Sequence, residues 1–202
     1  MMKKIDLKKE LPFYKAKSQP AIVEIPSLRY LQIDGTGDPN TAMEYKDAVE
    51  ALFSVSYTLK FMIKKSAMGI DYSVMPLEGL WWADDMNDFM TRDKTRWKWT
   101  SMMLQPGFIT ENHFREAIEK LAAKKKLPAL GKIRFENYAE GKCVQVLHTG
   151  PFSAEGPAIQ QLHAFAAEQG LSLHGKHHEI YLNDFRKIAP EKMKTILRQP
   201  VN

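Results

Sequence analysis

Residues 177–184, "HHEIYLND", hold the side chains best suited to chemistry. Side chains alternate along a strand, so Ile180 and Leu182 would face one side, and Glu179 and Tyr181 the other. A carboxylate beside a phenol on that second face is either ordinary solvent-exposed surface or the lining of a pocket. In an apolar pocket, burial would raise the pKa of Glu179. The carboxylate would then serve as a general base on water, or attract a planar cation among aromatic rings.

The tryptophans are the second unusual feature, because all four fall within two neighbouring predicted strands: Trp81, Trp82, Trp97 and Trp99. They form a core cluster, a dimer face or a ligand-binding surface. Trp81 and Trp82 face opposite sides of their strand, so at most one of them is plain core. We expect Trp82, which shares a face with Leu80 and Glu78, to be the one that meets a ligand.

A metal site is not expected, although His174, His177 and His178 precede Glu179. His177 and His178 point to opposite sides of a strand, whereas metal ligands usually share a face. The single cysteine, Cys143, excludes an internal disulfide and a Cys-based metal site, and fits a small buried residue. We expect no cofactor.

Composition is that of an ordinary globular protein, with 202 residues, 44% hydrophobic and 26% charged. The net charge of +5 is dispersed along the chain, which permits nucleic-acid binding without arguing for it. No apolar run has the length of a signal peptide or a membrane span, so no membrane association is expected. Together with the lone cysteine, this favours a cytoplasmic location.

The predicted elements fall in the same order in both halves of the chain. In the first half, strands at 21–25 and 28–34 precede a helix of about 25 residues capped by Thr41, with Glu44 completing a capping box. Then come a strand at 72–83, a polar loop at 84–96 and a strand at 97–106. The second half has strands at 133–139 and 143–150, a helix at 154–170, and strands at 173–184 and 192–201.

This order predicts an α+β fold built as a pseudo-two-fold duplication of a β-α-β-β unit. The segment "YLQIDGTG" at 30–37 also aligns with "CVQVLHTG" at 143–150. We expect residues 1–19 to be an N-terminal lead and 20–202 to be a single domain. Its two repeats, about 20–107 and 132–202, would be joined by a helix at 110–127, with a central ligand groove between them.

The chain resembles the GyrI-like small-molecule-binding family. The resemblance rests on "CVQVLHTGPFSAEGPAIQQLHAF" at 143–165, "HEIYLND" at 178–184 and "LEGLWW" at 77–82. It implies two similar halves around a groove, with Glu179 in that groove among aromatic side chains. In multidrug-sensing activators such a domain binds lipophilic cations and follows a helix-turn-helix. Only a short basic lead precedes residue 20 here, so direct DNA binding is not expected.

Stand-alone members of this family that are rich in tryptophan resemble enzymes that open the cyclopropane ring of DNA-alkylating natural products by adding water. The tryptophan pair and the second Trp-rich strand of this chain favour that type. We therefore expect a xenobiotic-detoxifying hydrolase whose ligand is planar and hydrophobic or cationic. Glu179 would activate water, and Tyr138 or Tyr181 would donate a hydrogen bond to the oxygen that becomes negative. The expected ligand-binding residues are Trp81, Trp82, Trp99, His148 and Phe152.

Two other functions fit the same sequence. One is a non-catalytic multidrug-binding protein that sequesters its ligand. The other is a protein-binding inhibitor of a DNA topology enzyme. The oligomeric state is not encoded in any pattern of the chain.

Overall fold

The computed structural model describes residues 4–84, 94–184 and 186–202, and in them eight strands form one sheet with every pairing antiparallel. The strands are β1 (Ala21–Ile25), β2 (Leu28–Thr36), β3 (Glu78–Trp82), β4 (Lys98–Leu104), β5 (Arg134–Tyr138), β6 (Gly141–Thr149), β7 (His177–Tyr181) and β8 (Lys194–Pro200). The α+β class is confirmed. Most of the predicted polar loop, residues 85–93, lies outside the described residues.

The strand order is β1-β6-β8-β7-β3-β4-β2-β5, so β7 and β3 meet in the middle. Outward from that central pair follow β8 and β6 on one side, and β4 and β2 on the other. The edge strands come from the opposite half of the chain: β1 pairs with β6, and β5 pairs with β2. The arrangement places Glu179 directly beside Gly79 at the centre of the sheet.

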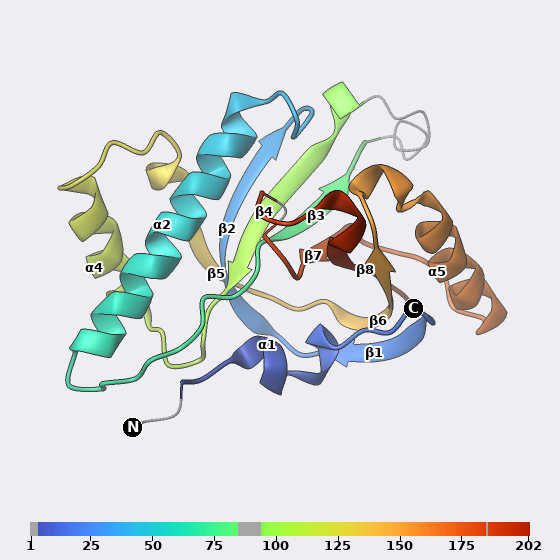
Figure 1. The fold of residues 1–202 in the computed structure, drawn as a ribbon, viewed down its shortest axis with the longest axis horizontal. Helices are drawn as coiled ribbons and strands as arrows, with labels where there is room; N and C mark the ends of the chain where they lie inside the picture. The colour runs from blue at the N-terminus through green and yellow to red at the C-terminus, as the bar shows by residue number, and fades with distance from the viewer. Residues whose placement is uncertain (1–3, 85–93, 185) are drawn as a thin grey trace.

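Two helices cover one face of the sheet, which we call the helix face (Figure 1). Helix α2 (Met43–Lys65) packs on β2 and β4, while α5 (Gly156–Glu168) packs on β6 and β8. A further helix, α4 (Glu111–Ala122), packs against α2. The inward side of α2 is set by apolar residues at helical spacing, all fully buried: Ala48, Leu52, Val55 and Leu59. No helix in the described ranges is long and apolar enough to cross a membrane.

The two helix starts differ from one another in their caps. Thr110 caps α4, since its hydroxyl accepts from the His113 backbone N–H and the His113 ring accepts from the Thr110 backbone N–H in return. The predicted Thr41 cap of α2 is wrong, because Ala42 is the N-cap and makes no side-chain bond. The backbone N–H groups of Thr41 and Ala42 both bond the Asp38 carbonyl, so a turn occupies this position.

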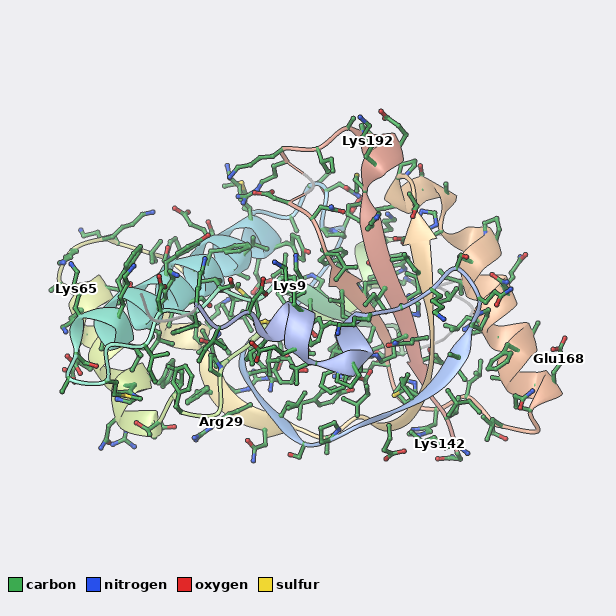
Figure 2. All side chains as sticks on the ribbon, turned by 60° about the horizontal axis from the view of Figure 1, so that its bottom comes forward. Lys9, Arg29, Lys65, Lys142, Glu168 and Lys192 are labelled. Carbon is green, nitrogen blue, oxygen red and sulfur yellow. The ribbon has the colours of Figure 1, made fainter. Side chains whose placement is uncertain are left out.

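The N-terminal segment packs on the other side of the sheet, which we call the opposite face. It forms α1 (Leu7–Glu10) and a short 3-10 turn (Pro12–Tyr14), and it lies in front of the central strands in Figure 2, where Lys9 is labelled. Phe13 and Tyr14 are buried there together with Leu80 and Ile180. The segment predicted as a lead therefore completes the hydrophobic core.

Candidate functional site

Glu179 lies on the helix face, in a row that runs across the sheet. Its strand neighbours are Leu197 on β8 and Gly79 on β3, and Ser101 of β4 follows Gly79 in the same row. The side chain of Glu179 is only 15% exposed. The solvent-facing interpretation of this strand is therefore excluded, because both of its faces are buried.

A chain of hydrogen bonds ends on the Glu179 carboxylate. The indole Nε1 of Trp81 donates to the Tyr181 hydroxyl over 3.2 Å, and this hydroxyl donates to Glu179 Oε2 over 2.7 Å. Gly79 makes room for this arrangement, because a Cβ at that position would lie 2.7 Å from Trp81 Nε1. The indole thus folds over the one residue of β3 that has no side chain and reaches the next strand.

Aromatic rings surround the carboxylate. The ring centroid of Tyr45, on α2, lies 5.9 Å from Trp81 and 5.0 Å from Trp99, and Trp97 lies 5.9 Å from Trp81. From the other half of the chain, the Phe152 ring meets Tyr181 edge-on at 5.4 Å. Such rings offer flat apolar surfaces and negative faces that suit a planar or cationic ligand.

Burial determines the protonation of this site. It raises the pKa of Glu179 to about 7, against the opposing effects of the Tyr181 hydrogen bond and the Lys94 charge. His177 Nε2 lies 3.7 Å from Glu179 Oε1, but burial lowers the pKa of His177 to about 3, so this imidazole is neutral. Near neutral pH Glu179 is thus poised between its two forms, as a general base on water requires.

Glu155 is a residue of this site that the sequence reading missed. It is 4% exposed, and burial followed by the Glu179 charge raises its pKa to about 9. In the sequence it stands just before a helix, where an acidic residue normally indicates an exposed cap. No periodicity marks it as buried, so only the fold reveals it.

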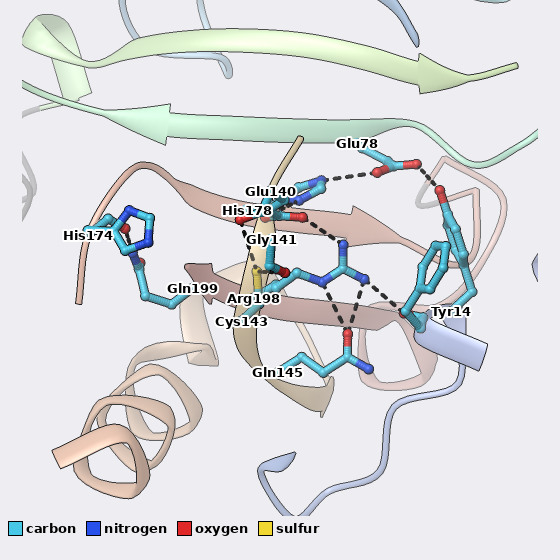
Figure 3. Close-up of polar contacts among 11 residues, drawn as sticks. Tyr14, Glu78, Glu140, Gly141, Cys143, Gln145, His174, His178, Arg198 and Gln199 are labelled. Carbon is cyan, nitrogen blue, oxygen red and sulfur yellow. Dashed lines mark hydrogen bonds and ion pairs between the residues drawn. The ribbon is translucent and has the colours of Figure 1, made fainter. Parts of the chain in front are cut away.

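The opposite face of the same strands carries a different set of charges (Figure 3). His178 Nδ1 lies 2.9 Å from Glu140 Oε1, and its Nε2 lies 3.0 Å from Glu78 Oε2. Arg198 binds Glu140 Oε2 over 2.9 Å, and Tyr14 donates to Glu78. Although acids and histidines gather on both faces, no group of three or more in the described ranges has a metal-binding arrangement.

The structure brings together six of the eight predicted site residues on the helix face. These are Glu179, Tyr181, Trp81, Trp99, His148 and Phe152. The buried His148 side chain lies 3.2 Å from the Pro151 carbonyl, and His148 pairs with Thr195, which in turn pairs with Tyr181.

Trp82 and Tyr138 lie on the opposite face, contrary to expectation. Trp82 alternates with Trp81 and carries the Lys176 ammonium 3.4 Å above its ring. Tyr138 packs edge-on against Tyr30 at 6.4 Å. The prediction that Trp82 contacts the ligand beside Glu179 is wrong, because Trp82 shares a face with Leu80 and Glu78. That face is the one of His178, not that of Glu179.

Two hollows in the described structure lie away from this site. One, of about 610 Å³, is between α2 and α4, with Tyr57, Phe61 and His113 in its lining. The other lies beside Tyr14 and Leu182. Neither is lined by Glu179, so neither is the central ligand groove expected between the two halves.

Comparison with known proteins identifies the family to which this chain belongs. The pattern of the GyrI-like small molecule binding domain matches residues 18–201. The chain belongs to this family. No curated protein matches it.

Solved structures resemble the GyrI-like chain over its whole length. An uncharacterized conserved protein from Listeria innocua is 41% identical with a TM-score of 0.91, covering 98% of this chain and 100% of its own. A hydrolase from the same organism is 40% identical with a TM-score of 0.88, covering 99% and 100%. The C-terminal domain of EcmrR is 14% identical with a TM-score of 0.55, covering 91% and 97%, and shares the fold alone.

Proposed function

We propose that this GyrI-like domain binds planar, hydrophobic xenobiotics on the helix face and hydrolyses those that carry a strained cyclopropane. The observation that carries the proposal is the buried Glu179 carboxyl, with a pKa of about 7, set among aromatic rings. The likeness to a Listeria hydrolase at 40% identity supports a hydrolytic reaction.

The ligand enters by displacing aromatic side chains, among which Phe152 is 39% exposed and comes from a short turn before α5. The Trp81 and Trp99 indoles and the Tyr45 ring stack on it and exclude bulk water. Glu179 takes a proton from one water, whose oxygen attacks the strained carbon as the ring carbon–carbon bond breaks, and the electron pair of that bond moves to a ligand oxygen, which becomes negative. Tyr181, already held by Trp81 and hydrogen-bonded to Glu179, fixes the direction of the carboxylate.

Passive sequestration is the second candidate, and one observation favours it. Glu179 has no ion pair with Lys or Arg among the described residues, while Tyr45, Trp81 and Trp99 form an aromatic cluster on the same face of the sheet. A cationic planar drug would supply the missing positive charge by ion pairing and cation–π contact. Binding then needs no chemistry.

We further propose that the two halves, about 20–107 and 132–202, are copies of one β-α-β-β unit. The strand order supports this, since it reads identically from either edge when β1 to β4 are exchanged with β5 to β8. Glu179 and Gly79 occupy matched positions on the two central strands, and the glycine leaves the space in which Trp81 lies.

The test is to incubate the protein with a cyclopropane-bearing alkylator and measure product mass. The expected product is heavier by one water, and Glu179→Gln should keep ligand affinity while turnover falls by about two to four powers of ten. Tight binding of intact ligand by the wild type would favour sequestration. Unchanged turnover in the variant would remove Glu179 from the mechanism.

A further inference from the structure

Glu155 sits where a carboxylate would normally bond to a helix, yet it does not. It directly precedes α5, whose first backbone N–H groups need acceptors. The structure shows no side-chain cap hydrogen bond from Glu155 to this helix. Its Oε1 is buried without a hydrogen-bond partner in the described part of the chain.

The position of Glu155 directs it toward Glu179. Phe152, one turn earlier, contacts the Tyr181 ring at 5.4 Å. The Thr195 side chain interacts with the Glu155 carboxyl, and Thr195 pairs with Tyr181 across β8 and β7. Glu155 and Glu179 therefore approach the same phenol from α5 and from β7.

The charges around the pair favour one shared proton. The other ionisable groups near Glu155 or Glu179 are Tyr181, His177 and His178 of β7, Tyr45 of α2 and Lys94 before β4. Lys94 favours the charged form of both carboxyls, but burial and mutual repulsion outweigh it for Glu155. Two carboxyls in one apolar site do not both ionise near neutrality.

We infer that Glu155 is the second acid–base group of this site, which protonates the ligand oxygen that becomes negative when Glu179 activates water. This inference rests on the proposed hydrolysis, for a ligand whose cyclopropane is conjugated to a carbonyl group. Water adds its oxygen to the ring carbon and gives a proton to Glu179. The electron pair of the broken carbon–carbon bond moves to the carbonyl oxygen, which takes the proton of Glu155. Transfer from Glu179 back to Glu155 then restores both groups.

The test uses a spiro-cyclopropane conjugated to a dienone, with kcat/KM measured from pH 5 to 10. For the wild type we expect a rise through about pH 7, as Glu179 ionises, and a fall above about pH 9, as Glu155 ionises. Glu155→Gln should lower kcat/KM by about 100-fold and abolish the fall at high pH. Its affinity for a dienone without the cyclopropane should be unchanged. Glu168→Gln, exposed at the other end of α5, is the matched control and should behave as the wild type.

The wild type could add water while Glu155→Gln shows the same rate and pH profile. That result would overturn the role of Glu155 and leave the proposed function standing. Absence of product from the wild type would overturn both. A second measurement does not depend on turnover or on the Glu155 variant. In carbon-13 NMR of labelled glutamate carboxyls, Glu179→Gln should lower the pH at which Glu155 titrates, and an unmoved titration would contradict the coupling.

Discussion

Two pairs of buried glutamates lie on the two faces of the same central strands, and their surroundings are opposite. On the opposite face, Glu78 and Glu140 meet His178 and Arg198 at hydrogen-bonding distance. On the helix face, Glu155 and Glu179 form no ion pair with Lys or Arg among the described residues. The first pair is thus compensated by nearby cationic side chains, whereas the second has no Lys or Arg partner within ion-pairing distance among the described residues.

The pKa directions follow from this difference. Burial would raise the pKa of Glu140, but His178 and Arg198 lower it to about 2. For Glu179 and Glu155, burial wins and raises the pKa to about 7 and about 9. Residues 178 and 179 are adjacent in the chain, so side-chain alternation alone separates the ion-paired network of His178 from the carboxyl site of Glu179.

Breaking the compensated network should have the largest effect on stability. Arg198→Met would leave Glu140 buried without the guanidinium, at a cost of about 3–5 kcal/mol in the free energy of unfolding. Urea denaturation measures this loss. Lys194→Met, exposed on the same strand, is the control and should change little. A loss below about 1 kcal/mol for Arg198→Met would show that the network is not compensated by this side chain.

Neutralising one carboxyl of the Glu155–Glu179 pair should instead stabilise the fold at alkaline pH. A raised folded pKa means that the stability of the wild type falls as pH rises from about 4.5 towards the folded values of about 7 and 9. Glu155→Gln should therefore be more stable at pH 8 on the order of 2 kcal/mol, and nearly unchanged at pH 4. Urea denaturation at both pH values compares them. A destabilised variant at pH 8 would mean that the carboxyl of Glu155 is compensated like that of Glu140.

The opposite face should respond to pH in two windows of its own. The contribution of Glu140 is present above about pH 4.5 and is lost as pH falls through about 2, because its folded pKa is lowered. The contribution of His178 is complete below about pH 6.5 and is lost as pH rises through its raised folded pKa. The free energy of unfolding of Glu155→Gln, measured from pH 2 to 9, should still fall at acidic pH, where the contribution of Glu140 is lost. The absence of this fall would contradict the compensated state of Glu140.

Filling the space beside Glu179 should disturb the site more than the fold. Gly79→Ala places a methyl group 2.7 Å from Trp81 Nε1, which must move away from Tyr181. We expect a cost of about 1–2 kcal/mol and a changed near-ultraviolet circular dichroism of the tryptophans. Gly107→Ala is the control, because nothing lies within 4 Å of a Cβ there. An unaltered spectrum in Gly79→Ala would argue against the indole position.

Removing the phenol hydroxyl should have the smallest effect. The Tyr181 hydrogen bond favours the charged form of Glu179, so Tyr181→Phe should raise the pKa of Glu179 by on the order of one unit. The rise of kcat/KM with pH would move upward by the same amount. A downward movement would show that the hydroxyl does not donate to the carboxylate.

The sequence by itself determined the type and order of the eight strands and of helices α2, α4 and α5, and the alternation that separates His178 from Glu179. These depend on neighbours along the chain, through side-chain periodicity and local backbone hydrogen bonds. It also placed Cys143 in the core, where the structure finds it fully buried.

Only the tertiary structure decided which side chains meet. Trp82 and Tyr138 lie away from Glu179 because the pairing of β3 with β7, and of β5 with β2, fixes their faces. Glu155 comes near Glu179 because α5 packs on β8, where Thr195 lies beside Tyr181 of β7. Contacts between residues far apart in the chain depend on strand register and on helix packing. The local pattern of residues predicts neither the register nor the packing.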